Sequence, residues 1–178
     1  RSKMKVKNVF ALGTMLICVM LLTSCASSVK RTDDIYNFKY AGQKFNKVSI
    51  SLNSEAQEKL KDNSSFNADK FSEAVKKQLN DKALLFAGSQ DLIDIVITNI
   101  RTRSTASAML LGFMAGDDRI EGDVLIKNTD GKILNSFTVS ASYALGGFVG
   151  GIEDVRMNWL YDKFAELTVK NIVGEKTD

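Results

Sequence analysis

The stretch DLIDIVITNIRTRS, residues 91–104, decides the fold of this chain. It is rich in isoleucine and valine, and its apolar character is nearly continuous from Leu92 to Ile97. β-Branched side chains favour strands, and a continuous apolar run favours a strand that is covered on both faces. We therefore predict a central strand here, with the rest of the chain arranged around it.

Two segments that precede this strand predict a second strand and a helix. The segment KVSISL, residues 47–52, alternates apolar side chains with serines, which is the pattern of a half-buried strand. Further along, Phe71, Val75 and Leu79 recur every four residues. This single apolar stripe indicates an amphipathic helix that packs on the sheet.

A hairpin and a long closing helix are predicted after the central strand. Asp130-Gly131 lies between two strand-like segments, and Asp-Gly is a strong signal for a tight turn between antiparallel strands. Residues 152–173 predict the helix, and Gly174 is placed to end it. Its expected apolar side consists of Val155, Trp159, Leu160, Phe164, Leu167 and Ile172.

These elements place the chain in the α+β class. The order strand, helix, strand, strand, strand, helix predicts a single domain over residues 47–174. Its sheet is expected to be mixed or antiparallel, with about four strands, and to be packed with the two main helices. No internal repeat is visible, so one domain accounts for the predicted core.

The first 24 residues, 1–24, predict a signal peptide. They combine four basic residues with an apolar run of about 14 residues, from Val9 to Leu22, and they contain no acidic residue. Such a run is shorter than the roughly 20 residues that cross a bilayer as a helix, whereas it suits a cleaved secretory signal. We therefore expect the domain to be exported.

The end of this run, Leu22-Thr23-Ser24-Cys25, resembles the lipobox of bacterial lipoproteins. The resemblance implies cleavage before Cys25 and attachment of acyl chains, palmitate among them, to its sulfur and to the new amino terminus. Two or three acyl chains suffice for stable anchoring. Residues 25–46 are then expected to form the lipidated amino terminus and a flexible tether. The non-acidic Ala26 implies sorting to the outer membrane, with the domain facing the periplasm.

Composition argues against several classes of function. Without the four basic residues of the signal, the 24 Lys and Arg fall to 20 against 21 Asp and Glu, so no positive footprint remains for nucleic acid. There is no histidine, and the remaining cysteine is the predicted lipid acceptor. We therefore expect no enzyme, no metal site and no cofactor apart from the covalent lipid. The acidic pairs lie at the ends of predicted elements, where solvated or helix-capping acids are ordinary: Asp33-Asp34, Asp117-Asp118 and Glu153-Asp154.

Two apolar loops rich in glycine are the candidate contact site. AMLLGFMAGDD (residues 108–118) and ALGGFVGGIED (residues 144–154) flank the hairpin strands, so antiparallel pairing brings them to one end of the sheet. The loops either pack on each other and on the last helix or expose an apolar patch to a partner or a membrane. A phosphate cradle is disfavoured because no Lys-Ser/Thr pair follows the glycines. The candidate partner-contact residues are Leu111, Phe113, Met114, Phe148 and Val149, and the conformational glycines are Gly112, Gly116, Gly146, Gly147, Gly150 and Gly151.

The same segments carry a family resemblance. LIDIVITNI, SAMLLGFMAGDDRIEGDVLIKNTDGKIL and SYALGGFVGG resemble the Gram-negative lipoproteins described as the domain of unknown function numbered forty-four ten. The resemblance covers about residues 47–173. It implies a periplasm-facing envelope lipoprotein with no established reaction.

We therefore expect a membrane-anchored, non-catalytic interaction or scaffold module of a cell-envelope assembly. Its expected partners are the membrane, reached through the lipid anchor, and an unidentified envelope protein. One alternative is a binding protein for a small apolar or cell-wall ligand, with a pocket lined by residues such as Phe113, Phe148 and Trp159. The other alternative is an enzyme, which the absence of histidine and of a free cysteine disfavours.

Overall fold

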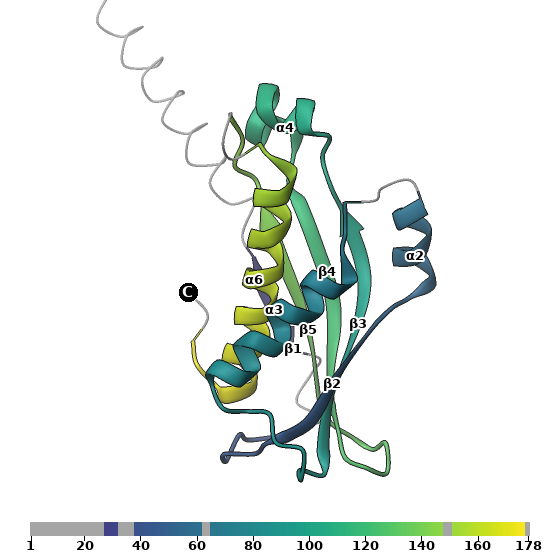
Figure 1. Cartoon of the computed structure of the whole chain (residues 1–178), viewed down its shortest axis with the longest axis vertical. Coiled ribbons are helices and arrows are strands. Elements are labelled where there is room, and N and C mark those ends of the chain that lie inside the picture. The colour runs from purple at the N-terminus through teal and green to yellow at the C-terminus, as the bar shows by residue number, and fades with distance from the viewer. Residues whose placement is uncertain (1–26, 32–37, 62–64, 148–150, 177–178) are drawn as a thin grey trace, which may run out of the picture.

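The centre of the fold is a single open sheet in the computed structural model, which describes residues 27–31, 38–61, 65–147 and 151–176 (Figure 1). Its five strands lie in the order β1-β5-β4-β3-β2, with β2 parallel to β3 and the other neighbours antiparallel. The predicted α+β class is confirmed, with one strand more than expected. The strands are β1 (Ser28–Arg31), β2 (Phe45–Leu52), β3 (Asp91–Arg101), β4 (Asp118–Lys127) and β5 (Ile133–Tyr143), and the helices are α2 (Ser54–Lys61), α3 (Ala68–Asp81), α4 (Thr105–Leu111), the short 3-10 helix η2 (Gly112–Ala115) and α6 (Glu153–Val173).

Helices α3 and α6 lie side by side over one face of the sheet, and α2 lies on the other side of it (Figure 1). The predicted stripe of α3 is confirmed, because Phe71, Val75 and Leu79 are fully buried. Asn67 caps this helix, since its side-chain oxygen accepts a hydrogen bond from the backbone N–H of Lys70 at 2.9 Å. Packing of such an apolar face supplies most of the stability of a helix in a folded protein.

Helix α6 ends before Gly174, as predicted, but its first turns differ from the prediction. Four of the six predicted apolar residues are buried: Leu160, Phe164, Leu167 and Ile172. Val155 and Trp159 are instead 41% and 39% exposed. Trp159 leans on Tyr143, the last residue of β5, with ring centroids 5.2 Å apart. Val155 lies one helical turn earlier, past the end of the strand, so the sheet cannot cover it.

Strand β3 lies inside the sheet, between β2 and β4, but it is not buried on both faces. Ile93, Ile95 and Ile97 are fully buried, whereas Leu92 and Val96 are partly exposed. The prediction of burial on both faces is wrong because α3 and α6 cover only one face (Figure 1). The strand therefore shows the alternation of a sheet with one solvated face.

The second face of the sheet carries the polar residues of the same strands. Lys127 Nζ lies 2.7 Å from Asp94 Oδ2, and Thr138 Oγ1 donates to Asp123 at 2.7 Å. Burial alone would raise the pKa of Asp94, but hydrogen bonds from Lys127 and Ser49 hold it below its ordinary value. Cross-strand pairs of this kind stabilise the sheet face that α3 and α6 do not cover.

The predicted hairpin joins β4 to β5 and is confirmed. Gly131 has a φ of 79°, and its N–H donates to the carbonyl of Asn128 at 3.0 Å. Asn128 in turn donates its N–H to the carbonyl of Lys132 at 3.1 Å. Because the two strands are antiparallel, the start of β4 and the end of β5 lie beside each other at the opposite end of the sheet.

Strand β1 corrects the expected tether of residues 25–46. Four of these residues pair antiparallel with β5, in a register that places Ser28 opposite Ser140. Val29 packs against the core from this position. An unpaired edge of β5 would offer free backbone groups, so this short segment gains hydrogen bonds by docking on it.

Phe164 fills the middle of the core, where β4 leaves room for it. Its ring packs against Phe71 with centroids 5.1 Å apart. A Cβ at Gly122 of β4 would come within 3.1 Å of the Phe164 ring and within 3.1 Å of the Ile97 side chain. Glycine at this position therefore lets the aromatic ring of α6 approach the sheet closely.

Phe164→Ala is expected to lower the free energy of unfolding by about 3–5 kcal/mol, since it removes a large side chain that the neighbours cannot replace. Val155→Ala, on the exposed side of the same helix, should change it by no more than about 0.5 kcal/mol. Urea unfolding followed by circular dichroism measures both variants. Equal midpoints would show that the buried face of α6 is wrongly assigned.

Candidate functional site

The two predicted loops lie together at one end of the sheet, as their places on β4 and β5 led us to expect (Figure 1). The first loop folds as α4 and η2, and the second follows β5. A Cβ on Gly146 would come within 2.3 Å of Gly112 Cα and within 2.4 Å of the Ala108 carbonyl oxygen. Gly112 also has a φ of 53°, which favours glycine. A larger residue at position 146 would therefore force the loops apart, whereas a side chain at position 112 would strain the backbone.

The outer surface of both loops is apolar and open to solvent. Phe113 is 63% exposed, and Met114 and Leu110 are 78% and 83% exposed. Within the described ranges, nine large apolar side chains are exposed. One of them belongs to Phe86, whose backbone N–H bonds to the start of β2, at the opposite end of the sheet. The other eight lie at the loop end, and we name them the apolar tip: Leu110, Leu111, Phe113, Met114, Leu145, Ile152, Val155 and Trp159.

The remaining candidate residues divide between this end and the part of the chain that the structure does not describe. Leu111 belongs to the apolar tip, and three further candidate glycines lie in the same two loops: Gly116, Gly147 and Gly151. Cys25 and the signal peptide lie outside the described residues, as do Phe148, Val149 and Gly150. Among the helices that are described, none is long and apolar enough to cross a membrane.

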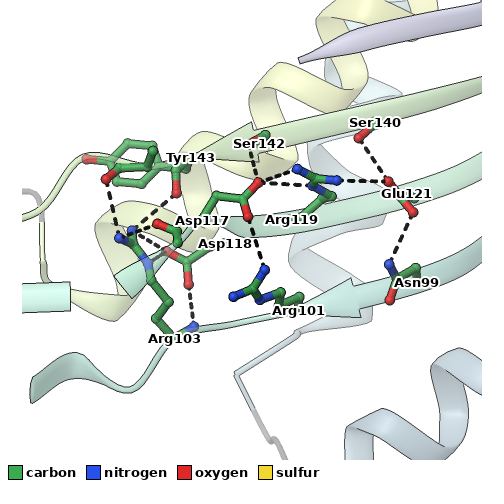
Figure 2. Close-up of polar contacts among 12 residues, drawn as sticks. Asn99, Arg101, Arg103, Asp117, Asp118, Arg119, Glu121, Ser140, Ser142 and Tyr143 are labelled. Atoms are coloured by element: carbon green, nitrogen blue, oxygen red, sulfur yellow. Dashed lines mark hydrogen bonds and ion pairs between the residues drawn. The ribbon is translucent and has the colours of Figure 1, made fainter. Parts of the chain in front are cut away.

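A buried ionic cluster lies at the loop end of the sheet, and Figure 2 shows two of its members, Arg103 and Asp118. Asp118 begins β4 and is fully buried, and Arg103 and Arg156 are 6% and 1% exposed. Arg103 donates to the Asp118 carboxylate from its backbone N–H at 2.6 Å, from Nε at 3.1 Å and from Nη2 at 2.8 Å. Arg156 of α6 brings its Nε within 2.9 Å of the same carboxylate, in an ion pair without hydrogen-bond geometry. Two arginines thus share one buried carboxylate.

Arg103 also holds both loops by their backbones. In the first loop, its Nη1 donates to the carbonyl oxygens of Gly112 at 2.6 Å and Gly116 at 3.0 Å. In the second loop, Nη1 donates to Ala144 at 3.3 Å and Nη2 to Leu145 at 3.0 Å. A guanidinium can make several such bonds because its N–H groups point outward in a fixed plane. Carbonyls that irregular loops leave unpaired are satisfied in this way.

The expectation of a solvated or capping pair is wrong for Asp117-Asp118, which are 4% and 0% exposed. The sequence contained a signal for this cluster in the alternation of β4 and in the helical periodicity of α6. Asp118 lies two residues before Ile120 on the core face of β4, and Arg156 lies four residues before Leu160 on the buried face of α6. A charge on a core-facing position needs an opposite charge nearby, so each position pointed to a buried partner.

Asp117 anchors a second polar group beside this cluster (Figure 2). Ser142 Oγ donates to its carboxylate at 2.6 Å, and Arg119 Nη2 donates to it at 2.7 Å. Burial alone would raise the pKa of Asp117, but the hydrogen bonds from Ser142 and Arg119 and the charges of Arg119 and Arg101 hold it below its ordinary value. The carboxylate therefore stays ionised and links the start of β4 to the end of β5.

An open hollow of about 360 Å³ lies between the two loops. Its lining consists of residues 109–113 and 144–147 and does not include Trp159. No side chain in this lining is a strong hydrogen-bond donor or acceptor, so the hollow offers apolar contact and backbone groups only. In the described ranges, no group of three or more histidine, cysteine, aspartate or glutamate residues is placed to hold a metal ion.

Comparison with known proteins gives one family and a shared fold. The matching family model is described as "Domain of unknown function (DUF4410)" and covers residues 18–147. No curated protein matches significantly. A PelC variant from Paraburkholderia phytofirmans, solved as a dodecamer, is 11% identical with a TM-score of 0.50, over 85% of this chain and 100% of that one. A minor lipoprotein from Acinetobacter baumannii is 12% identical with a TM-score of 0.41, over 73% and 94%.

Asp118→Asn is expected to lower the free energy of unfolding by about 3–5 kcal/mol, because it leaves two buried arginines without their carboxylate. The matched control is Asp123→Asn, on the polar face of the same strand, where the change should stay within about 1.5 kcal/mol. Unfolding in urea measures both without adding salt that would screen charges. A loss at Asp118 no larger than that at Asp123 would contradict the role of the cluster in holding the loop end.

Proposed function

The chain belongs to the family described as domain of unknown function DUF4410, and we propose that it is a lipid-anchored envelope protein whose domain acts as a non-catalytic interaction or scaffold module. Acyl chains on Cys25 would hold it at the outer membrane, with the domain on the periplasmic side. The observation that carries the proposal is the apolar tip.

The apolar tip has the properties of a contact surface. Monomeric soluble proteins rarely leave a large contiguous apolar patch in water, and such patches mark sites of association. Leu110, Phe113 and Met114 are exposed on loops whose backbones are fixed from below by Arg103. Covering these side chains therefore requires little ordering of the backbone, which favours binding.

A binding protein for a small apolar or cell-wall ligand is the second candidate, and the hollow between the loops is the observation in its favour. Its volume of about 360 Å³ is at the lower end of the range for ligand pockets. The hollow is open, however, and its lining offers no polar side chain to orient a ligand. Trp159, which was expected in such a pocket, lies outside it. The geometry therefore favours contact with a surface.

A scaffold can also consist of several copies of this chain. PelC, which shares the fold at a TM-score of 0.50, was solved as a dodecamer. Analytical ultracentrifugation of the purified lipoprotein, in a detergent matched to the density of the buffer, separates a monomer from a homo-oligomer. The result decides whether the scaffold role includes self-association.

Cys25→Ser should abolish fatty-acid labelling of the full chain in cells and leave an uncleaved precursor, because the sulfur that receives lipid is gone. Cys18→Ser is the matched control, since Cys18 lies in the apolar run that cleavage removes. It should incorporate label as the wild type does. Equal labelling of the two variants would contradict the lipobox and, with it, the anchor.

A photo-crosslinking residue at position 113 should form adducts in intact envelopes, because the proposal places another surface against the apolar tip. Position 86 is the matched control, since Phe86 is 61% exposed, close to the 63% of Phe113, but lies at the other end of the sheet. Mass spectrometry identifies a protein adduct or a lipid adduct. No adduct at position 113, or equal adducts at both positions, would contradict a contact role for the tip.

A further inference from the structure

The chain enters the sheet at the same end as the apolar tip. Strand β5 runs toward the loops and β1 is antiparallel to it, so the start of β1 and the preceding Ser27 lie on the side of the tip. Ser27 is fixed there, because the N–H of Ser142 donates to its Oγ at 3.0 Å and this Oγ donates to the Ser142 carbonyl at 3.4 Å. Ser142 itself lies two residues before the second loop, which begins at Ala144.

Cys25 is two residues away from Ser27. A fully extended chain spans at most about 3.6 Å per residue, so the Cα of Cys25 lies within roughly 7 Å of the Cα of Ser27. Acyl chains on Cys25 are therefore attached at the tip end of the domain. A flexible tether over residues 25–46 would have allowed any orientation, but the docking of β1 removes that freedom.

The apolar tip has the chemistry of a surface that can enter lipid. Residues 104–116 and 144–152 contain no charged side chain. The charges that flank the first of these stretches, Arg103 and Asp117, are 6% and 4% exposed. Glu153 and Asp154, which follow the second stretch at the start of α6, are accessible to water, so this part of the tip reaches no deeper than the headgroups. Charges are the costly groups to bring into a membrane, and these two stretches contribute none.

The loop backbones are also suited to such a surface. Lipid offers no hydrogen bonds, so irregular backbone is tolerated at a membrane only where protein groups satisfy it. Arg103 satisfies the carbonyls of Gly112, Gly116 and Leu145 from inside the domain. These polar groups therefore face inward, while the apolar side chains of the tip face outward.

We infer that the apolar tip dips into the surface of the phospholipid bilayer that holds the lipid anchor, and that this second contact fixes the orientation of the domain. The inference rests on the proposed function, because it requires acylation of Cys25. Acyl chains alone retain the protein at the membrane, so the tip adds orientation. A patch for a second copy or for a protein partner could lie anywhere on the surface, whereas a patch beside the anchor meets the bilayer first.

The test uses the acylated protein, reconstituted into phosphatidylcholine vesicles. Phe113→Cys carries an environment-sensitive fluorophore, and Phe86→Cys carries the same label at the opposite end. Acylation occupies Cys25 and cleavage removes Cys18, so the introduced thiol is the one that reacts. A doxyl group on the lipid acyl chains quenches labels inside the bilayer, and iodide quenches labels in water.

We expect doxyl lipid to quench the label at position 113 and iodide to leave it bright, with the reverse at position 86. Quenching by iodide at both positions would overturn the inference, because the tip would then face water. A tip label that neither quencher reaches would also overturn it, and loss of this protection on dilution would identify a second copy as the cover.

Mass spectrometry of the same sample separates this inference from the proposed function. If the chain is not acylated, the result contradicts the proposed function and removes the basis of the inference with it. If the chain is acylated but iodide quenches the tip label, the result contradicts the inference alone. A protein adduct from the photo-crosslinking residue at position 113, with an acylated chain, likewise leaves the interaction role standing and assigns the tip to a protein partner.

Discussion

The position of the loop end depends on one buried carboxylate, that of Asp118. A fully buried anion is stable only when cations compensate it, and Arg103 and Arg156 do so from the segment after β3 and from α6. Arg103 is thereby held in one orientation, and its remaining N–H groups reach the carbonyls of both loops. The place of one side chain on β4 thus helps to set the geometry of both loops.

Apolar residues in place of the ionic cluster would not hold these loops in the same way. Hydrophobic attraction has no direction. If apolar residues replaced the ionic cluster, they would therefore also attract the side chains of Leu110 and Phe113, which are now exposed. Hydrogen bonds are directional, and Arg103 holds the loops by their carbonyls while the side chains stay outside. Buried ion pairs contribute little net stability compared with apolar packing, so we assign to this cluster the selection of one arrangement. Gly146 permits it because a Cβ there would separate the backbones, and Gly112 permits it through its positive φ.

The sequence predicted those parts of the structure that depend on near neighbours. The four-residue spacing in α3 and the Asp130-Gly131 turn are local patterns, and both are confirmed. The cluster of Arg103, Asp118 and Arg156 was missed because its members come from three segments, and only the tertiary fold brings them together. Strand β1 was missed for a similar reason: SVKR has no strong period of its own, and the edge of β5 makes it a strand.

The proposed membrane contact at the tip would give the domain one orientation relative to the bilayer. Strand β5 has 11 residues, so at about 3.3 Å per residue its far end lies roughly 35 Å from the loops. Along this length, the face of the sheet opposite α3 and α6 carries charged pairs such as Asp94 with Lys127. Such a face would leave polar contacts available to a partner while the tip made the proposed contact with lipid. The proposed scaffold role would require this separation, because one surface cannot hold a membrane and a protein partner at the same time.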